Sequence, residues 1–421
     1  MPALSSLSQR LSGIASNRLT IPLLCVGAFL LRVIVAFAAP DHFWSYTSYY
    51  FLANTLAHGG GYCMEPGRLC AFFPPVFPTV VAAAVLVGHV KAGVGVLASL
   101  AGTGTVWLTW RMGKLLFSPV TGLLAAAYAA LYPYYVWHDS VLQENATLAF
   151  VVALSIWLML RLQRSQSRIL AMVTGMMLAI AVLTKANLSA YLPLALLWTA
   201  FALPGTWRKR AQVVLSLTFG MTLLLVPWFV RTWRITGAPI IYSNGGFSLW
   251  TANHRLTFDY FPQRSIDAAQ EAEWLDVPPA ERHEMYELGD PQFIRETQWF
   301  WNRGMAFIRA NPTLTARRAV YKIWIAFSPA FSPAQGIAFQ SVYLISYLPL
   351  FVLAPLGMWR SRRAWRLHGC IYLLFTSFAV SCAVFWGHTS HRMYLEPYLM
   401  IFAASTLSGR TNDCDSANAF R

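Results

Sequence analysis

Apolar segments long enough to cross a lipid bilayer recur along the chain, separated by short polar stretches. A membrane-spanning helix needs about 20 predominantly apolar residues, so the pattern predicts an all-α polytopic membrane protein. When the basic clusters are assigned to the cytoplasm, the chain makes about ten crossings and has both termini inside. The predicted crossings lie near residues 20–39, 95–110, 118–136, 143–161, 169–184, 188–204, 211–230, 338–358, 369–386 and 395–408.

The polar stretches divide the chain into four regions. Residues 1–230 form a predicted N-terminal membrane module, whose first external loop spans residues 41–94. Residues 231–337 form a second external region, which contains most of the acidic residues. Residues 338–408 return to the membrane, and residues 409–421 form a cytoplasmic tail.

Helix signals also occur outside the predicted crossings. Residues 74–89, "PPVFPTVVAAAVLVGH", are apolar but short and Pro-rich. We expect them to lie in the outer leaflet, and a true crossing is the alternative. In the second external region, "DAAQEAEWL" and "PPAERHEMYEL" predict short amphipathic helices. The stretch "NRGMAFIRANPTLTARRAVYKIW" predicts a helix, a break at Pro, and a helix that runs to the membrane.

Composition supports a membrane protein and argues against a nucleic-acid partner. The 421 residues are 57% hydrophobic and 12% charged, and a soluble domain usually carries about twice that share of charge. The formal net charge of +15 is concentrated in short clusters between crossings, such as residues 161–168 and 360–366. This distribution is typical of topology signals, so we expect membrane lipids as partners and no nucleic acid.

Two of the six cysteines, Cys63 and Cys70, lie in the first external loop within "CMEPGRLC". A disulfide suits an oxidising compartment, and we expect one here, with two free thiols as the alternative. No His or second Cys pair follows at ligand spacing. No metal or cofactor is therefore indicated, although a divalent metal stays an option if several carboxylates converge.

Two acids, Asp139 and Glu144, interrupt the aromatic and aliphatic stretch "YYVWHDSVLQENATLAFV". Carboxylates are costly beside hydrocarbon. Five residues on one helix correspond to a rotation of about 500°, so both acids can face one site only if a turn separates them. Solvation at the membrane surface is an equal alternative for Asp139. Capping of the following helix is the alternative for Glu144.

Further polar residues fall on the predicted outer side, at turns far apart in the sequence. Any one cation at a helix end could simply snorkel to the interface. Several cations together with acids resemble a site that holds an anionic group beside a general base. The candidates for binding are Tyr49, Lys185, Arg231, Arg234, Asn253, His391 and Arg392, and the candidates for catalysis are Asp41, Asp139 and Glu144.

These segments together resemble the membrane glycosyltransferases of the GT-C fold, in the branch of bacterial protein O-mannosyltransferases and the aminoarabinose transferase of lipid A. The resemblance rests on "YFLANTLAHGGGY", "LYPYYVWHDSVLQENATLAF", "LTKANLSAYLPL", "PWFVRTWRITGAPIIYSNGGFSLWTANH", "WNRGMAFIRANP" and "HRMYLEPYLMIFA". It implies a GT-C-like bundle with external juxtamembrane helices. Glu144 matches the acid of the second external turn. The acid of the first loop is expected near Ser45, whereas this chain has Asp41 one helical turn earlier.

The resemblance implies transfer of a sugar from a polyprenyl-phosphate donor to a lipid, glycan or protein acceptor, with inversion, at the periplasmic face of a bacterial inner membrane. Asp41, or failing that Glu144, would be the base, and the cations would hold the phosphate. A transporter or flippase for lipid-linked saccharides and an inactive homologue that serves as an envelope scaffold are the alternatives.

Overall fold

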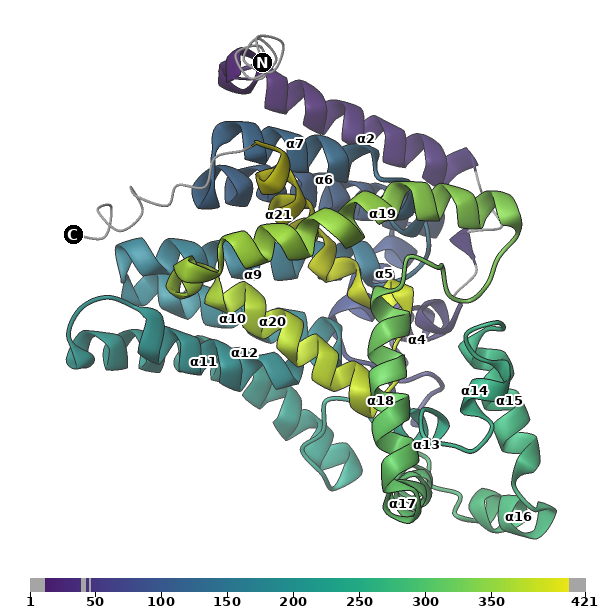
Figure 1. Ribbon diagram of the computed structural model, residues 1–421. Helices are drawn as coiled ribbons and strands as arrows, with labels where there is room; N and C mark the ends of the chain where they lie inside the picture. The colour runs from purple at the N-terminus through teal and green to yellow at the C-terminus, as the bar shows by residue number, and fades with distance from the viewer. Residues whose placement is uncertain (1–11, 39–42, 45–46, 409–421) are drawn as a thin grey trace.

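The structure is a computed structural model that describes residues 12–38, 43–44 and 47–408, and these residues form helices and no strands (Figure 1). Among the described residues, six helices are long and apolar enough to cross a membrane, and the last of them includes a 3₁₀ turn at its start. They are α2 (Thr20–Ala38), α6 (Val90–Leu116), α9 (Asn145–Ser165), α12 (Trp207–Thr236), α19 (Ile337–Arg360) and α20 (Trp365–Val384). The predicted all-α membrane architecture is confirmed.

Shorter helices run beside the six long ones and complete the bundle. They are α7 (Pro119–Leu131), α10 (Arg168–Thr184), α11 (Tyr191–Ala202) and α21 (Glu396–Ser408). Each of the ten predicted crossings coincides with one of these ten helices, although the number that cross the bilayer stays a prediction. One boundary was wrong: the helix expected over 118–136 ends at Leu131, and a separate short helix, α8 (Pro133–His138), follows. Pro133 lacks the amide hydrogen that a continuous helix needs.

Close approach of backbones holds the bundle together, as between α10 and α12. A Cβ atom on Gly175 would lie 2.0 Å from the carbonyl oxygen of Leu217, and one on Gly220 would lie 2.0 Å from that of Met172. Only glycine fits at these two positions. Small residues at helix crossings replace the hydrophobic driving force that lipid does not supply.

The first external loop forms α4 (Ser48–Ala57) and α5 (Val76–Leu86), which pack against each other. Tyr49, Leu52 and Ala53 form the buried face of α4. The apolar segment 74–89 contains α5, a helix of 11 residues, which is much shorter than a hydrocarbon core requires. Cys63 and Cys70 form the expected disulfide.

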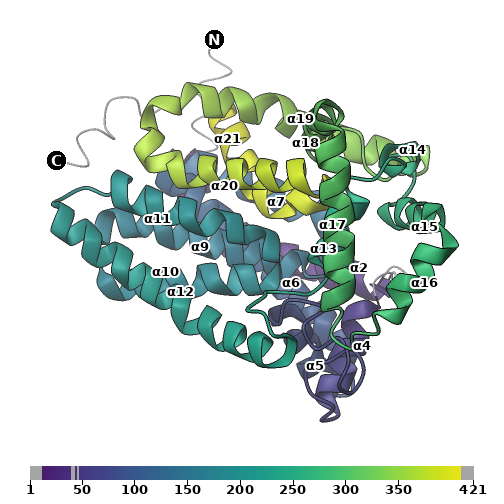
Figure 2. The same ribbon diagram turned by 90° about the horizontal axis from the view of Figure 1, so that it is seen from below.

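The second external region gathers at one end of the bundle in both views (Figures 1 and 2). Its helices are α13 (Gly245–Thr251), α14 (Thr257–Tyr260), α15 (Ile266–Asp276), α16 (Pro279–Glu287), α17 (Ile294–Ala310) and α18 (Pro312–Phe327). The predicted amphipathic helices correspond to α15 and α16. The break predicted at Pro lies between α17 and α18.

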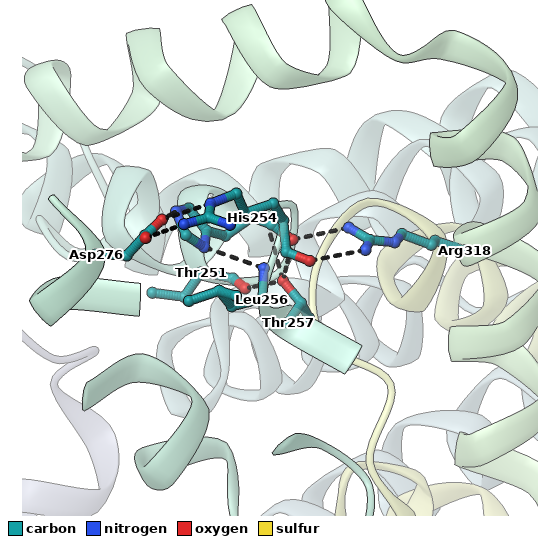
Figure 3. A network of polar contacts seen from close by, with 7 residues as sticks. Thr251, His254, Leu256, Thr257, Asp276 and Arg318 are labelled. Carbon is teal, nitrogen blue, oxygen red and sulfur yellow. Dashed lines mark hydrogen bonds and ion pairs between the residues drawn. The ribbon is translucent and has the colours of Figure 1, made fainter. Parts of the chain in front are cut away.

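A polar network around the turn after α13 joins three parts of this region (Figure 3). The guanidinium of Arg318, on α18, donates to the carbonyl oxygens of His254 and Arg255 at 2.7 and 3.0 Å. His254 Nε2 lies 3.4 Å from a carboxylate oxygen of Asp276, at the end of α15. Thr257 donates to the carbonyl oxygen of Thr251 at 2.9 Å. These contacts fix the external helices relative to one another.

Candidate active site

Two polar side chains from separate segments contact Glu144, which immediately precedes α9. The Nζ atom of Lys185 donates to Glu144 Oε1 at 2.7 Å, and the hydroxyl of Tyr49 donates to Oε2 at 2.9 Å. Lys185 ends α10, and Tyr49 lies on α4. The fold therefore brings together three residues that sequence reasoning had assigned to a common site.

Glu144 does not form a hydrogen-bonded helix cap. It occupies the N-cap position of α9, but its side chain makes no capping hydrogen bond, so a hydrogen-bonded cap does not account for its presence. Burial alone would raise the pKa of Glu144. The charge and hydrogen bond of Lys185, together with the hydrogen bond from Tyr49, outweigh burial and hold the pKa below its usual range. The carboxylate is ionised at neutral pH.

Glu144, Lys185 and Tyr49 line a cavity of about 680 Å³. The rest of the lining is largely aromatic and aliphatic, so charged and apolar side chains share one cavity. The apolar part of the lining comes mainly from the outer parts of α12 and α20 and from the segment after α12, and it includes Phe229, Ile240, Ile241, Phe378, Val380, Val384, Phe385 and Trp386. Such a cavity suits a ligand with an anionic head and an apolar body.

His391 lines the same cavity, from the short 3₁₀ helix η3 (Thr389–Leu395) between α20 and α21. Its Nδ1 atom lies 3.3 Å from the carbonyl oxygen of Trp386, so Nδ1 carries the hydrogen and Nε2 is left as an acceptor. Burial, and next the positive charge of Lys185, lower the pKa of His391 to about 3. The imidazole is therefore neutral in the unliganded protein.

Asp139, the other acid of the stretch "YYVWHDSVLQENATLAFV", pairs with an arginine outside the cavity. Its carboxylate accepts a hydrogen bond of 2.6 Å from Arg32 Nε, and both side chains are buried. Arg32 also donates to the carbonyl oxygens of Ala28, Ala129 and Ala130. This pair explains the arginine inside the first crossing, and Asp139 is not part of the cavity lining.

The predicted cation Arg392 points into the core instead of the cavity. It is fully buried and pairs with Glu396 at 3.0 Å. It also donates to the carbonyl oxygen of Ala326 at 2.6 Å and lies 3.7 Å from the ring centre of Tyr347. These contacts indicate a structural role for Arg392 in the core, whereas the adjacent residue His391 lines the cavity.

Three further candidates also lie outside the cavity lining. Arg231 donates to the carbonyl oxygens of Cys70 and Tyr62 at 2.9 and 3.1 Å, and so ties α12 to the disulfide loop. Arg234 is exposed one turn further along α12. Asn253 is buried and accepts a hydrogen bond from Lys322 at 3.2 Å. The structure thus supports Tyr49, Lys185 and His391 for binding more than these three.

Asp41 and Ser45 lie outside the described residues. The role of Asp41 as the base therefore stays a prediction, as does the effect of having Ser45 where the family has an acid. Among the residues that the structure describes, no group of three or more His, Cys, Asp or Glu side chains could hold a metal ion. A site that needed Asp139 as a ligand would have to break its contact with Arg32.

Several cavity residues carried no signal in the sequence. They are uncharged, and they line the cavity only because distant segments fold together; examples are Asn187, Ser189, Tyr242, Asn244 and Ser381. For Asn187, the only indication in the sequence was its position two residues after Lys185. Nothing local marked Ser381, which lies on the outer half of α20.

Comparison with known proteins supports the fold. The family model described as dolichyl-phosphate-mannose-protein mannosyltransferase matches residues 73–232, a range that contains Glu144 and Lys185. No curated protein sequence matches the chain.

Solved structures resemble the chain over nearly its whole length. The apo oligosaccharyltransferase of Archaeoglobus fulgidus matches with a TM-score of 0.56 and 13% identity, covering 93% of this chain and 51% of the archaeal one. The oligosaccharyltransferase AglB of Archaeoglobus fulgidus, in complex with an inhibitory peptide and a dolichol-phosphate, matches with a TM-score of 0.54 and 12% identity over the same shares. The chain thus spans about half the length of these structures. The predicted GT-C-like bundle is confirmed.

Proposed function

We propose that the protein is an integral membrane glycosyltransferase that moves a sugar from a polyprenyl-phosphate donor to a hydroxyl-bearing acceptor. The single observation that carries the proposal is a cavity lined both by Glu144, Lys185 and Tyr49 and by many aromatic and aliphatic side chains. This cavity lies in a GT-C-like fold, and two of its charged residues, Glu144 and Lys185, lie in the part of the chain that matches the mannosyltransferase family model.

Two features support a lipid phosphate as the donor. The Lys185 ammonium has three donors and spends one on Glu144, which leaves two for a phosphate. The aromatic and aliphatic part of the lining offers a surface for the first isoprene units. The archaeal oligosaccharyltransferase of similar fold has been solved with a dolichol-phosphate, which is a ligand of this class.

In the proposed reaction, a base removes the proton of the acceptor hydroxyl as its oxygen forms a bond to C1 of the sugar. The bond between C1 and the phosphate oxygen breaks, and polyprenyl phosphate leaves with the electron pair. Lys185 stabilises the charge on the leaving phosphate. One displacement inverts the anomeric centre.

Asp41 is the proposed base, because Glu144 is committed to its two donors and its lowered pKa makes it a poor proton acceptor. Glu144 instead positions Lys185. Nε2 of His391 is placed to accept a hydrogen bond from a sugar hydroxyl. We place the reaction at the periplasmic face of a bacterial inner membrane, because every acid of the site falls on the outer side of the predicted topology.

The test is transfer from a polyprenyl-phosphate sugar by the purified full-length protein. We expect Asp41→Asn to lower the rate by about 10²–10⁴-fold, as loss of a general base does, and Glu144→Gln to lower it less. Full activity in both variants would contradict the base assignment. Movement of the lipid-linked sugar across proteoliposomes without any transfer would instead favour the flippase, and neither activity would favour the scaffold.

A further inference from the structure

A second polar cavity lies at the opposite ends of the helices that carry the candidate active site. Glu144 immediately precedes α9, whereas Arg161 and Arg164 lie near its other end. A helix of 21 residues is about 32 Å long, close to the thickness of a hydrocarbon core. The two cavities therefore face opposite leaflets if α9 crosses the bilayer.

The second cavity has a volume of about 520 Å³ and lies between α9 and the end of α6, which pack together. Its lining includes four cations, Arg111, Lys114, Arg161 and Arg164, and the ring of Trp157. We name this the Trp157 pocket.

Aromatic rings draw these cations together instead of letting them spread into solvent. The ring centre of Trp157 lies 5.6 Å from Cζ of Arg111 and 5.2 Å from Cζ of Arg161. The ring centre of Trp110 lies 5.8 Å from Cζ of Arg111 and 5.5 Å from Nζ of Lys114. Cation–π contacts of this kind contribute modestly at exposed sites and hold like charges close to one another.

No carboxylate balances this cluster within the described residues. None of the four cations is within ion-pair distance of an acid there, and the sequence contains no Asp or Glu at residues 66–138 or 145–258. Clustered like charges repel one another. An anion in the pocket would remove that repulsion and satisfy several donors at once.

The exposed surface of α6 next to the pocket indicates that the anion is the headgroup of a lipid. Along α6, Leu97, Leu100 and Trp107 are exposed on the part of the helix that would lie within the hydrocarbon. A molecule with an anionic head in the pocket and apolar chains along α6 would match both surfaces.

We propose that the Trp157 pocket binds the headgroup of an anionic phospholipid in the leaflet opposite the candidate active site. Arginine suits the phosphate because its planar fork can donate two hydrogen bonds to it. The four cations are enough for a headgroup with two phosphates. The alternative is that these residues act only as topology signals, as clusters of Lys and Arg commonly do.

The test uses cardiolipin as the probe and native mass spectrometry of the full-length protein as the measurement. The pocket variant is Arg111→Gln/Arg161→Gln. The matched control is Arg208→Gln/Lys209→Gln, which removes the same charge from an exposed basic cluster beside Trp207. We expect the apparent Kd for cardiolipin to rise at least about tenfold in the pocket variant and less than about twofold in the control. An equal rise in both, or none in either, would overturn the proposal.

A second measurement on the wild-type protein keeps the proposal testable if the pocket variant does not fold. We expect cardiolipin to raise the unfolding temperature more than phosphatidylcholine does, and glycerol phosphate at the same concentration to leave it unchanged. Equal stabilisation by phosphatidylcholine would overturn the anionic preference. Competition by glycerol phosphate at a similar concentration would show a site for free phosphate and overturn the lipid assignment.

Discussion

Asp139 and Glu144 are five residues apart and both pair with a cation, yet their surroundings are opposite. The Arg32–Asp139 pair is sealed, with side chains 0% and 3% exposed. The Lys185–Glu144 pair lines a cavity, and its side chains are 21% and 9% exposed. The first pair connects α2 to the end of α8, and the second leaves donors available for a ligand.

The difference shows that a carboxylate beside hydrocarbon is not by itself a sign of catalysis. Arg32 also donates to three backbone carbonyl oxygens, and Gly102 makes room, because a Cβ there would lie 2.3 Å from Asp139 Oδ2. Neither Arg32 nor Asp139 lines the cavity. What distinguishes a functional pair is the unused bonding capacity that faces a cavity.

The largest effect is expected from breaking the sealed pair. Asp139→Asn leaves the Arg32 charge buried without its counter-ion, which typically costs about 3–5 kcal/mol. We expect a strong fall in the unfolding temperature in detergent, while the fraction that remains folded keeps its transfer rate. Thermal unfolding and single-turnover transfer, measured on the same preparation, check the two parts.

Glu65→Gln is the control, because the Glu65–Arg68 pair is exposed and such pairs contribute about 0–1 kcal/mol. Replacement of both buried partners, as Arg32→Met/Asp139→Leu, should recover part of the stability, since neither charge is then left alone. A stable Asp139→Asn protein without transfer activity would instead give Asp139 the catalytic role that the sequence suggested.

Breaking the Lys185–Glu144 pair should lower the transfer rate strongly and the stability only a little. Lys185→Met removes the proposed phosphate contact, and loss of one such donor typically lowers the rate by about 10²–10³-fold. Its partner Glu144 borders the cavity, so we expect a smaller loss of stability than for Asp139→Asn. Lys91→Met is the control, because Lys91 does not line the cavity. Transfer at the wild-type rate by Lys185→Met would remove Lys185 from the mechanism.

The helices were predictable because their signal is local. Runs of apolar residues, proline breaks and glycines near helix ends act over a few residues, and all ten predicted crossings coincide with helices. The break at Pro133 was missed because the aromatic stretch around it continues the apolar pattern, although proline at that position ends the helix.

The site was predictable only in part, because the direction of a side chain depends on packing between distant segments. His391 and Arg392 are adjacent, yet one lines the cavity and the other is buried against Tyr347. The sequence placed both on an outer turn and could not separate them. Likewise, Asp139 gave no sign of its contact with Arg32, which is 107 residues away.

A third buried carboxylate sharpens the comparison, because no cation is paired with it. Glu273 on α15 is fully buried, and none of the described cations lies within ion-pair distance of it. Burial raises the pKa of Glu273 to about 9, since Thr257 and the more distant Arg318 only partly offset it. Glu273 is therefore protonated in the folded protein at neutral pH.

The raised pKa predicts a loss of stability as the pH rises. In the unfolded chain the group has its ordinary pKa of 4.5, so above that pH the unfolded state gains by ionising while the folded state keeps its proton. The contribution of Glu273 is complete below pH 4.5 and is lost as the pH rises towards 9. Glu273→Gln cannot ionise, so we expect it to match the wild type near pH 5 and to be more stable by about 1–3 kcal/mol at pH 8.

Thermal unfolding from pH 5 to pH 9 measures the effect, with Glu271→Gln as the control because that side chain is exposed on the same helix. The control should follow the wild type at every pH, because the side chain of Glu271 is exposed and packs against nothing in the described part of the chain that its replacement would disturb. If Glu273→Gln also follows the wild type, the carboxyl of Glu273 is ionised in the folded protein and an uncharacterised cation or water must stabilise it. In that case Glu273, like Asp139, would be a buried carboxylate whose charge is compensated. Only its position in a cavity lining would then set Glu144 apart from the other two acids.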